Sequence, residues 1–157
     1  MATGYLASFE PAMRAALAEA EDAARGPVAD VPVGAVILDS GGAIVARGRN
    51  RREADRDPTA HAEIVAIRAA ARAVGDWRLP GMTLVVTLEP CTMCAGAVVD
   101  ARLARLVYGA ADPRAGAVGS LWDVVRDQHL APCPEVVAGV LADDCLRDIR
   151  RFFSERR

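Results

Sequence analysis

Two short motifs in the sequence contain the residue types that bind metals and move protons. The first is His-Ala-Glu at residues 61–63, and the second is Cys-Thr-Met-Cys at residues 91–94. Thiolate sulfurs and imidazole nitrogens are the ligands that zinc prefers in proteins. A carboxylate close to such a metal can take a proton from water and return it elsewhere. Together, the two motifs predict a zinc site with an acid–base partner.

The number of ligands indicates what kind of zinc site this is. We expect His61, Cys91 and Cys94 to bind one zinc ion per chain. Structural zinc sites usually have four protein ligands, whereas catalytic sites have three and leave a position for water. Glu63 lies two residues after His61, roughly 200° round a helix. We therefore expect Glu63 to act on the water as the catalytic proton carrier, and not to bind the metal.

The hydrophobic pattern places both motifs at the start of helices. We expect helices over residues 60–74 and 91–101, on either side of a buried strand over residues 83–88. The first of these helices carries Ile64, Ile67 and Ala71 on one stripe. Free backbone N–H groups and the positive end of the helix dipole favour thiolate at such a position. Cys91 and Cys94 are three residues apart, so their sulfurs share one side of the first helical turn.

The rest of the chain alternates between helical and extended patterns. We expect a helix over 8–25 capped by Ser8, strands over 33–38, 43–48, 104–110 and 134–140, a mostly irregular segment over 109–134, and a final helix after residue 140. This order predicts a mixed sheet with helices on both faces. Cys145 falls on the apolar stripe of the final helix and is interpreted as a core residue, whereas Cys133 is interpreted as an incidental loop thiol.

Length and composition exclude several classes of protein. The chain has 157 residues, which predicts a single domain over residues 1–157. No apolar run is long enough to cross a membrane, and the charged first thirty residues do not match a signal peptide. We therefore expect a cytoplasmic protein, in which the four cysteines are thiols or metal ligands rather than disulfides.

The charge pattern leaves two interpretations open. The net charge of −2 argues weakly against a general nucleic-acid binder, yet all nineteen basic residues are arginine. Ten of them form two clusters, Arg47, Arg49, Arg51, Arg52 and Arg56 and then Arg147, Arg150, Arg151, Arg156 and Arg157. Each cluster is either a solvated face or a surface that grips phosphate, for which the planar guanidinium is well suited.

Four longer segments carry a resemblance to a known family. They are "VPVGAV", "DPTAHAEIVAIR", "TLEPCTMCAGAVV" and "YGAADPRAGAVGSLWDV". Over residues 5–155 the sequence resembles the bacterial tRNA-specific adenosine deaminases, of the zinc-dependent cytidine and deoxycytidylate deaminase superfamily. The resemblance implies a three-layer α/β/α sandwich with a mixed five-stranded sheet. It also implies a homodimer that converts adenosine to inosine at the wobble position of a tRNA anticodon stem-loop.

The resemblance also assigns substrate contacts. Asn50 matches an asparagine that contacts the base, Ala62 and Pro90 match backbone contributors to the pocket, and Asp112 matches an aspartate near the RNA. Asn50 and Asp112 fit ordinary turn residues equally well.

One segment departs from the family pattern. The family has Asn-His before its last strand, and this sequence has Ala131-Pro132 at the matching positions. The missing asparagine would remove a contact to the base. Gln128 and His129 are the nearest polar residues that could replace it.

Two other functions remain open at this point. A deaminase of a free base or nucleoside, of the guanine or cytosine type, would use the same zinc and Glu63 but would not need the arginine clusters. A zinc-stabilised protein without catalytic activity is the third possibility. Glu63 and the absence of a fourth protein ligand argue against it.

Overall fold

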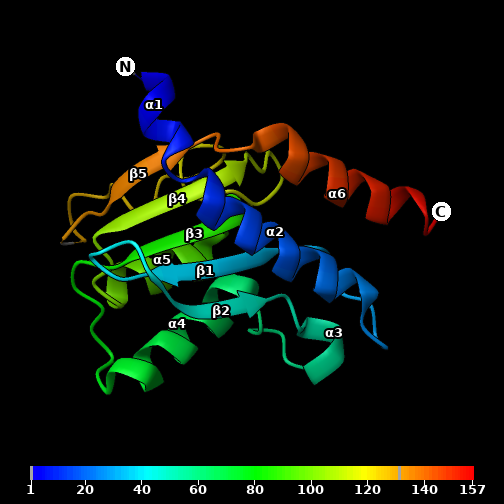
Figure 1. Ribbon diagram of the computed structural model, residues 1–157, viewed down its shortest axis with the longest axis horizontal. Coiled ribbons are helices and arrows are strands. Elements are labelled where there is room, and N and C mark those ends of the chain that lie inside the picture. Colours follow the sequence, from blue (N-terminus) through cyan, green and yellow to red (C-terminus); the bar gives the residue numbers. More distant parts are fainter. Residues whose placement is uncertain (1, 131) are drawn as a thin grey trace.

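The computed structural model of the chain describes residues 2–130 and 132–157. A mixed five-stranded sheet in the order β2-β1-β3-β4-β5 forms its middle layer (Figure 1). The strands are β1 (Gly34–Leu38), β2 (Ile44–Arg49), β3 (Thr83–Leu88), β4 (Arg105–Ala110) and β5 (Glu135–Ala138). The predicted strands are thus all present, with ends that shift by one residue or two.

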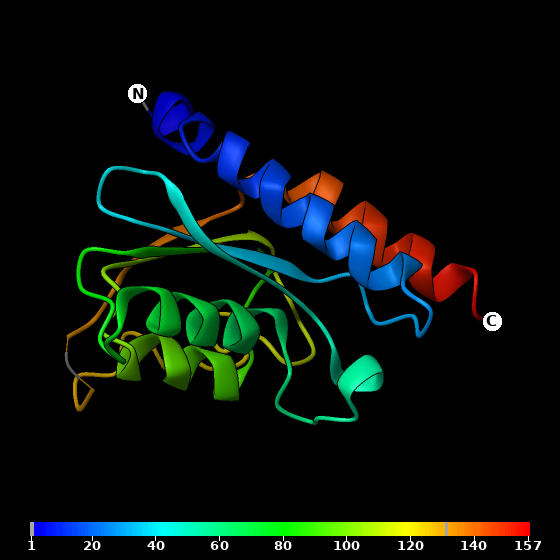
Figure 2. The ribbon, with the colours of Figure 1, turned by 60° about the horizontal axis from the view of Figure 1, so that its bottom comes forward.

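Helices cover both faces of this sheet (Figure 2). Helices α2 (Glu10–Arg25) and α6 (Ala142–Ser154) lie side by side on one face, and α4 (Ala62–Val74) and α5 (Thr92–Asp100) lie on the other. Two short helices, α1 (Ala2–Ala7) and α3 (Arg52–Asp55), complete the fold and were not predicted. The three-layer α/β/α sandwich is confirmed.

The two layers of helices share the side chains of the sheet. Successive residues of a strand point to opposite faces, so one apolar strand contributes side chains to two hydrophobic cores. Residues such as Ala35, Ile37, Leu84, Val86 and Leu106 pack with α4 and α5, and residues such as Val36, Leu38, Val85, Val107 and Val137 pack with α2 and α6. Cys145 lies in the second core, as predicted.

Strand direction brings the functional segments to one edge of the sheet. Strand β1 is antiparallel to both β2 and β3, while β3, β4 and β5 are parallel. The carboxyl ends of β2, β3, β4 and β5 therefore meet at the same edge. Asn50 follows β2, Glu89 follows β3 and Ala111 begins the long irregular segment after β4. Both predicted motifs consequently emerge at this edge.

Helix α4 packs closely against the sheet through a glycine. A Cβ atom added at Gly48 would lie 2.4 Å from the Ala62 carbonyl oxygen and 2.5 Å from the Ala66 nitrogen. The helix buries the small side chains of Ala62, Ala66 and Ala70, while Ile64 and Ile67 are only partly buried. The predicted stripe of Ile64, Ile67 and Ala71 is therefore rotated away from the most buried face, because backbone contact requires small residues there.

Two further observations concern the ends of the chain. Ser8 does not cap α2: its hydroxyl donates to the Tyr5 carbonyl oxygen, and Phe9 occupies the cap position without a side-chain hydrogen bond. The prediction for Ser8 was wrong because the chain is already helical before residue 8. Within the described residues, no helix is both long and apolar enough to cross a membrane.

We predict that Gly48→Ala lowers the free energy of unfolding by about 1–3 kcal/mol, since the added methyl group must push α4 off the sheet. The matched control is Gly96→Ala in α5, where an added Cβ meets nothing within 4 Å. Alanine favours the helix there, so the control should be neutral or slightly stabilising. Urea denaturation of the zinc-loaded proteins measures both changes, and equal stabilities would contradict the proposed contact.

Candidate active site and metal centre

The two candidate metal-binding helices begin in the same way. His61 is the N-cap of α4 with φ −70° and ψ 153°, and Cys91 is the N-cap of α5 with φ −72° and ψ 177°. Both residues are therefore extended, and each helix begins directly after its first metal-ligand candidate. The unpaired N–H groups and the positive dipole end of both helices converge on one place. The predicted positions at two helix N-termini are confirmed.

Three ligand atoms lie close together at this place. The His61 Nδ1 atom is 3.6 Å from the Cys91 Sγ atom and 3.5 Å from the Cys94 Sγ atom. Zn–S and Zn–N bonds of about 2.3 and 2.0–2.1 Å with tetrahedral angles place N and S about 3.6 Å apart. The two measured distances thus fit one zinc ion held by the three side chains. Among the described residues, this is the only group of three or more His, Cys, Asp or Glu side chains placed to hold a metal.

The two thiols differ in acidity. A hydrogen bond from Cys94 and another from His61 lower the pKa of Cys91 to about 4. The same interaction with Cys91, together with burial, raises the pKa of Cys94 well above its usual range. Burial and the neighbouring Cys91 thus favour the protonated form of Cys94, whereas zinc binds thiolate. A cation between the sulfurs must displace the Cys94 proton, so metal binding is coupled to proton release.

Glu63 lies beside this cluster in the first turn of α4. Its side chain is 4% exposed. Burial raises its pKa to about 7, although its own backbone N–H and the nearby His61 act in the opposite direction. A carboxyl group whose pKa lies close to neutral can both accept and donate a proton under physiological conditions. This is the property that a proton carrier requires.

A cavity of about 220 Å³ opens in front of the cluster. Its wall comes from segments at the shared edge of the sheet, namely Val31, Val33, Asn50, Arg52, His61, Ala62, Glu63, Leu88, Glu89, Cys91, Asp112 and Ala115. We call it the substrate cavity. Three of the four predicted substrate contacts, Asn50, Ala62 and Asp112, lie in this wall. Pro90 does not, and its carbonyl oxygen accepts a hydrogen bond from the Ala117 N–H at 2.8 Å.

Asn50 and Asp112 also shape their own loops. The Asn50 side chain donates to the Val31 carbonyl oxygen at 3.3 Å and accepts from the Arg52 N–H at 3.3 Å. The Asp112 carboxylate accepts from the backbone N–H groups of Arg114 and Ala115 at 2.9 and 3.3 Å. Both residues therefore stabilise the turns in which they lie and also line the substrate cavity.

Glu89 is a buried acid that the sequence reasoning did not single out. Its carboxylate accepts hydrogen bonds from the backbone N–H groups of Asp112, Val118 and Ser120, at 2.9, 3.0 and 3.0 Å. It also accepts one from the Ser120 hydroxyl. Burial alone would raise the pKa of Glu89, but these hydrogen bonds outweigh it and hold the pKa below its ordinary value. The sequence did indicate this residue in one way, because a glutamate stands between a buried strand and a metal-binding cysteine.

A groove of about 920 Å³ adjoins the substrate cavity and shares Val31, Leu88 and Asp112 with it. It runs between residues 111–114 and the C-terminal part of α6, and we call it the arginine groove. Its wall includes the half-exposed ring of Phe153 and four arginines, Arg114, Arg150, Arg156 and Arg157.

The two predicted arginine clusters do not behave uniformly. Arg49 pairs with Glu19 and Asp22, and Arg51 pairs with Asp55, so these guanidinium groups already have acidic partners. Arg147 and Arg151 pair with aspartates of their own helix in the same way. By contrast, Arg52, Arg114 and Arg150 form no ion pair within the described part of the chain. These three guanidinium groups border the cavity or the groove.

Gln128 and His129 do not line the substrate cavity. They precede β5, which begins at Glu135 opposite Arg105, at the first residue of β4. Because β4 and β5 are parallel, this end of the sheet lies opposite the edge that bears the cavity. Neither residue is therefore placed to contact a base in the substrate cavity of its own chain, and their proposed role stays a prediction. Ala131, where the departure from the family pattern begins, lies outside the described residues.

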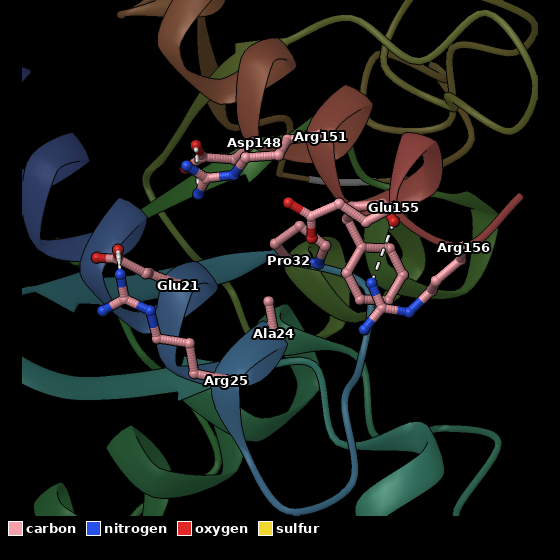
Figure 3. Close-up of a pocket in the computed structure, with 9 residues that line it drawn as sticks. Glu21, Ala24, Arg25, Pro32, Asp148, Arg151, Glu155 and Arg156 are labelled. Atoms are coloured by element: carbon pink, nitrogen blue, oxygen red, sulfur yellow. Dashed lines mark hydrogen bonds and ion pairs between the residues drawn. The ribbon is translucent and has the colours of Figure 1, made fainter.

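A second cavity, of about 260 Å³, lies between the C-terminal parts of α2 and α6 (Figure 3). Four of its charged groups pair with one another, and a fifth donates to a backbone carbonyl oxygen. Arg25 pairs with Glu21, Arg151 pairs with Asp148, and Arg156 donates to the Phe152 carbonyl oxygen at 3.1 Å. The cavity contains none of the metal-ligand candidates, so it is not the place of the proposed chemistry.

Comparison with known proteins agrees with this site. The model of the cytidine and deoxycytidylate deaminase zinc-binding region matches residues 7–110, a range that includes His61, Glu63 and both cysteines of the site. The chain belongs to this deaminase family. Zinc is the metal named for the matched region, and the ligand atoms of this deaminase fit it.

Individual relatives place the deaminase more narrowly. It is 45% identical over 148 residues to tRNA-specific adenosine deaminase of Haemophilus influenzae, covering 94% of this chain and 84% of that protein. A solved tRNA:A34 deaminase, studied for A-to-I editing at the wobble position of transfer RNA, has a TM-score of 0.83 and 43% identity, with 88% of this chain and 98% of that chain covered.

A longer relative contains only a partial match. The deaminase is 49% identical over 149 residues to tRNA(Ile)-lysidine synthase of Deinococcus deserti. The match covers 95% of this chain but only 27% of that protein, so the chain spans about a quarter of its length.

We predict that the purified protein binds one zinc per chain and that Cys94→Ser abolishes tight binding. Cys133→Ser, the same change at an exposed thiol outside the site, is the matched control and should keep full zinc content. Because Cys94 is protonated in the metal-free chain, zinc binding should release a proton, and affinity should fall as pH falls. Calorimetry in buffers of different ionisation enthalpy measures the proton count, and retention of stoichiometric zinc by Cys94→Ser would contradict the ligand set.

Proposed function

We propose that the chain is a tRNA adenosine deaminase, which hydrolyses adenosine to inosine at the wobble position of an anticodon stem-loop. The observation that carries this proposal is the continuity of the substrate cavity with the arginine groove. A free base needs only the cavity. A nucleotide within RNA also needs a path for the neighbouring phosphates and bases, and the groove offers unpaired guanidinium groups and an exposed phenylalanine ring. The names of the close relatives support the same substrate class.

The proposed reaction adds water to adenine C6 and releases ammonia. We assign His61, Cys91 and Cys94 as the residues that hold zinc. When bound, zinc acts as a Lewis acid and lowers the pKa of a water molecule toward about 7. Glu63 would take one proton from the attacking water and pass it to the ring nitrogen beside C6. It would then take the second proton of the added water from the new C6 hydroxyl and donate it to the amino group, which leaves as ammonia as the C6–N bond breaks. Its burial and its raised pKa support this exchange of protons.

The size of the cavity agrees with a single extruded base. A volume of about 220 Å³ cannot admit a stacked strand, so the target nucleotide must be turned out of the anticodon loop. Zinc nucleobase deaminases in general take their base in this way. In the wall, Asn50 is the proposed base contact, Ala62 is the proposed backbone contributor to the pocket, and Asp112 is the proposed residue near the RNA. Pro90 contributes by holding the neighbouring loop through its carbonyl oxygen.

We further propose that residues 1–157 form one deaminase domain that acts in the cytoplasm as a homodimer. The large apolar side chains of Leu121 and Trp122, in the loop after β4, are half exposed in the single chain. A second copy that covers them would remove this apolar surface from water, which supports a dimer. Free thiols suit a reducing compartment. Sedimentation at several protein concentrations tests the dimer.

Ammonia release from three substrate classes tests the proposed function. We expect activity on an adenosine-containing anticodon stem-loop and none on free guanine, cytosine or their nucleosides. Activity on a free base with none on any RNA would replace the proposal with a small-molecule deaminase. Zinc binding without release of ammonia from any substrate would indicate a non-catalytic protein.

We predict that Glu63→Gln reduces turnover of the stem-loop by at least about 10³-fold, because the amide cannot accept and return a proton. The same variant should keep one zinc per chain, since the proposed ligands are unchanged. Metal analysis and ammonia release on one preparation separate the two effects. Loss of zinc in this variant would make Glu63 a ligand.

We also predict that RNA affinity falls with salt. If Arg150 contacts a phosphate, Arg150→Ala should reduce the slope of log affinity against log salt by about 0.7. Arg72→Ala is the matched control, because this guanidinium lies in the last turn of α4, outside the cavity and the groove. An unchanged slope in Arg150→Ala would contradict the groove as the RNA path.

A further inference from the structure

The buried carboxylate of Glu89 holds a loop rather than a substrate or a metal. Its side chain is buried, with 2% of the residue exposed. One oxygen, Oε1, accepts from the backbone N–H groups of Val118 and Ser120. The other, Oε2, accepts from the Asp112 N–H and from the Ser120 hydroxyl. Charged acceptors of this kind form strong hydrogen bonds, and buried N–H groups that lose them are costly.

The loop that is held in this way forms one wall of the substrate cavity. Asp112 and Ala115 belong to that wall, and Arg114 belongs to the arginine groove. The next residue, Gly116, packs against the carboxylate so closely that an added Cβ would lie 2.4 Å from the Glu89 Cδ atom. Glu89 therefore fixes the segment that lies between the cavity and the groove.

We propose that Glu89 is a positioning residue that sets substrate affinity by holding the loop over residues 112–120 as a wall of the cavity. This inference rests on the proposed function for its choice of substrate. The hydrogen bonds from Asp112, Val118 and Ser120 all join the carboxylate to the loop. The groups assigned to metal binding and proton transfer lie in α4 and α5 or at their N-caps. Loss of the anchor should therefore raise KM more than it lowers kcat.

Replacement by glutamine tests the anchor, because the side chain keeps its shape but only one end can accept. If the amide nitrogen takes the place of Oε2, the Ser120 hydroxyl can turn to accept from it, but the Asp112 N–H loses its acceptor. If the amide nitrogen takes the place of Oε1, the N–H groups of Val118 and Ser120 lose theirs. In either orientation a buried N–H group is left without its partner, and the wall of the cavity loosens.

The experiment compares Glu89→Gln with the unmodified protein on one stem-loop substrate. We expect KM to rise by about tenfold or more and kcat to change by less than about threefold, with one zinc per chain retained. Hydrogen–deuterium exchange should accelerate in the peptide that contains Asp112 or in the peptide that contains Val118 and Ser120. Glu21→Gln makes the same chemical change at an exposed glutamate paired with Arg25 on α2. This control should change neither KM nor kcat.

Two further variants act on the same contact. Gly116→Ala should displace the loop by steric overlap and raise KM in the same way. If both changes act through one anchor, the KM increase in the Glu89→Gln, Gly116→Ala double variant should be smaller than the product of the single increases. Ser120→Ala removes one hydrogen bond and should raise KM by about two- to threefold, which keeps the test valid if the glutamine variant does not fold.

Specific outcomes would overturn the inference. They are an unchanged KM in the folded glutamine variant, a fall in kcat with KM unchanged, or independent effects of Glu89→Gln and Gly116→Ala. Unchanged exchange in both peptides of the loop would also overturn it. A failure of the proposed function is distinguishable, because the unmodified protein would then be inactive on the stem-loop, while the exchange measurement would still report on the anchor.

Discussion

The chemistry of this chain depends on two helix N-termini held close together. His61 and Cys91 are both extended cap residues, and their ligand atoms lie 3.6 Å apart although thirty positions separate them in the sequence. The parallel directions of β2 and β3 bring both helices to one edge of the sheet. The close contact at Gly48 then fixes α4 against β2. Without these constraints, the site would lack the separation that a tetrahedral metal requires.

The same edge supplies the remaining parts of the site. The segment after β2 gives Asn50 and Arg52, the turn after β3 gives Glu89, and the segment after β4 gives Asp112. A second buried carboxylate, that of Asp30, holds the segment after β2. Asp30 accepts hydrogen bonds from the N–H groups of Glu53 and Ala54, and so caps the short α3. Two of the cavity's loops are thus fastened by buried acids, which keeps the wall rigid while the arginines at its border stay exposed.

Local patterns predicted most of the elements and the metal ligands, because ligand type, helix starts and strand alternation are all short-range features. Packing details were less accessible. The buried face of α4 depends on Gly48, a residue of another element, so periodicity alone favoured Ile64 and Ile67 over Ala66 and Ala70. The role of Glu89 depends on N–H groups far along the chain. Gln128 and His129 were chosen because they are the polar residues nearest to Ala131 in the sequence, and nearness along the chain does not reveal which end of a strand faces the site.

X-ray absorption at the zinc edge tests the central claim of a three-ligand catalytic site most directly. For the zinc-loaded protein we predict two sulfur neighbours at about 2.3 Å and two nitrogen or oxygen neighbours at about 2.0 Å, one of them exchangeable water. Substitution of Glu63 by Gln should leave the number of sulfur and light-atom neighbours unchanged. A first shell with three or four sulfurs, or one that loses a light atom in that variant, would contradict the account.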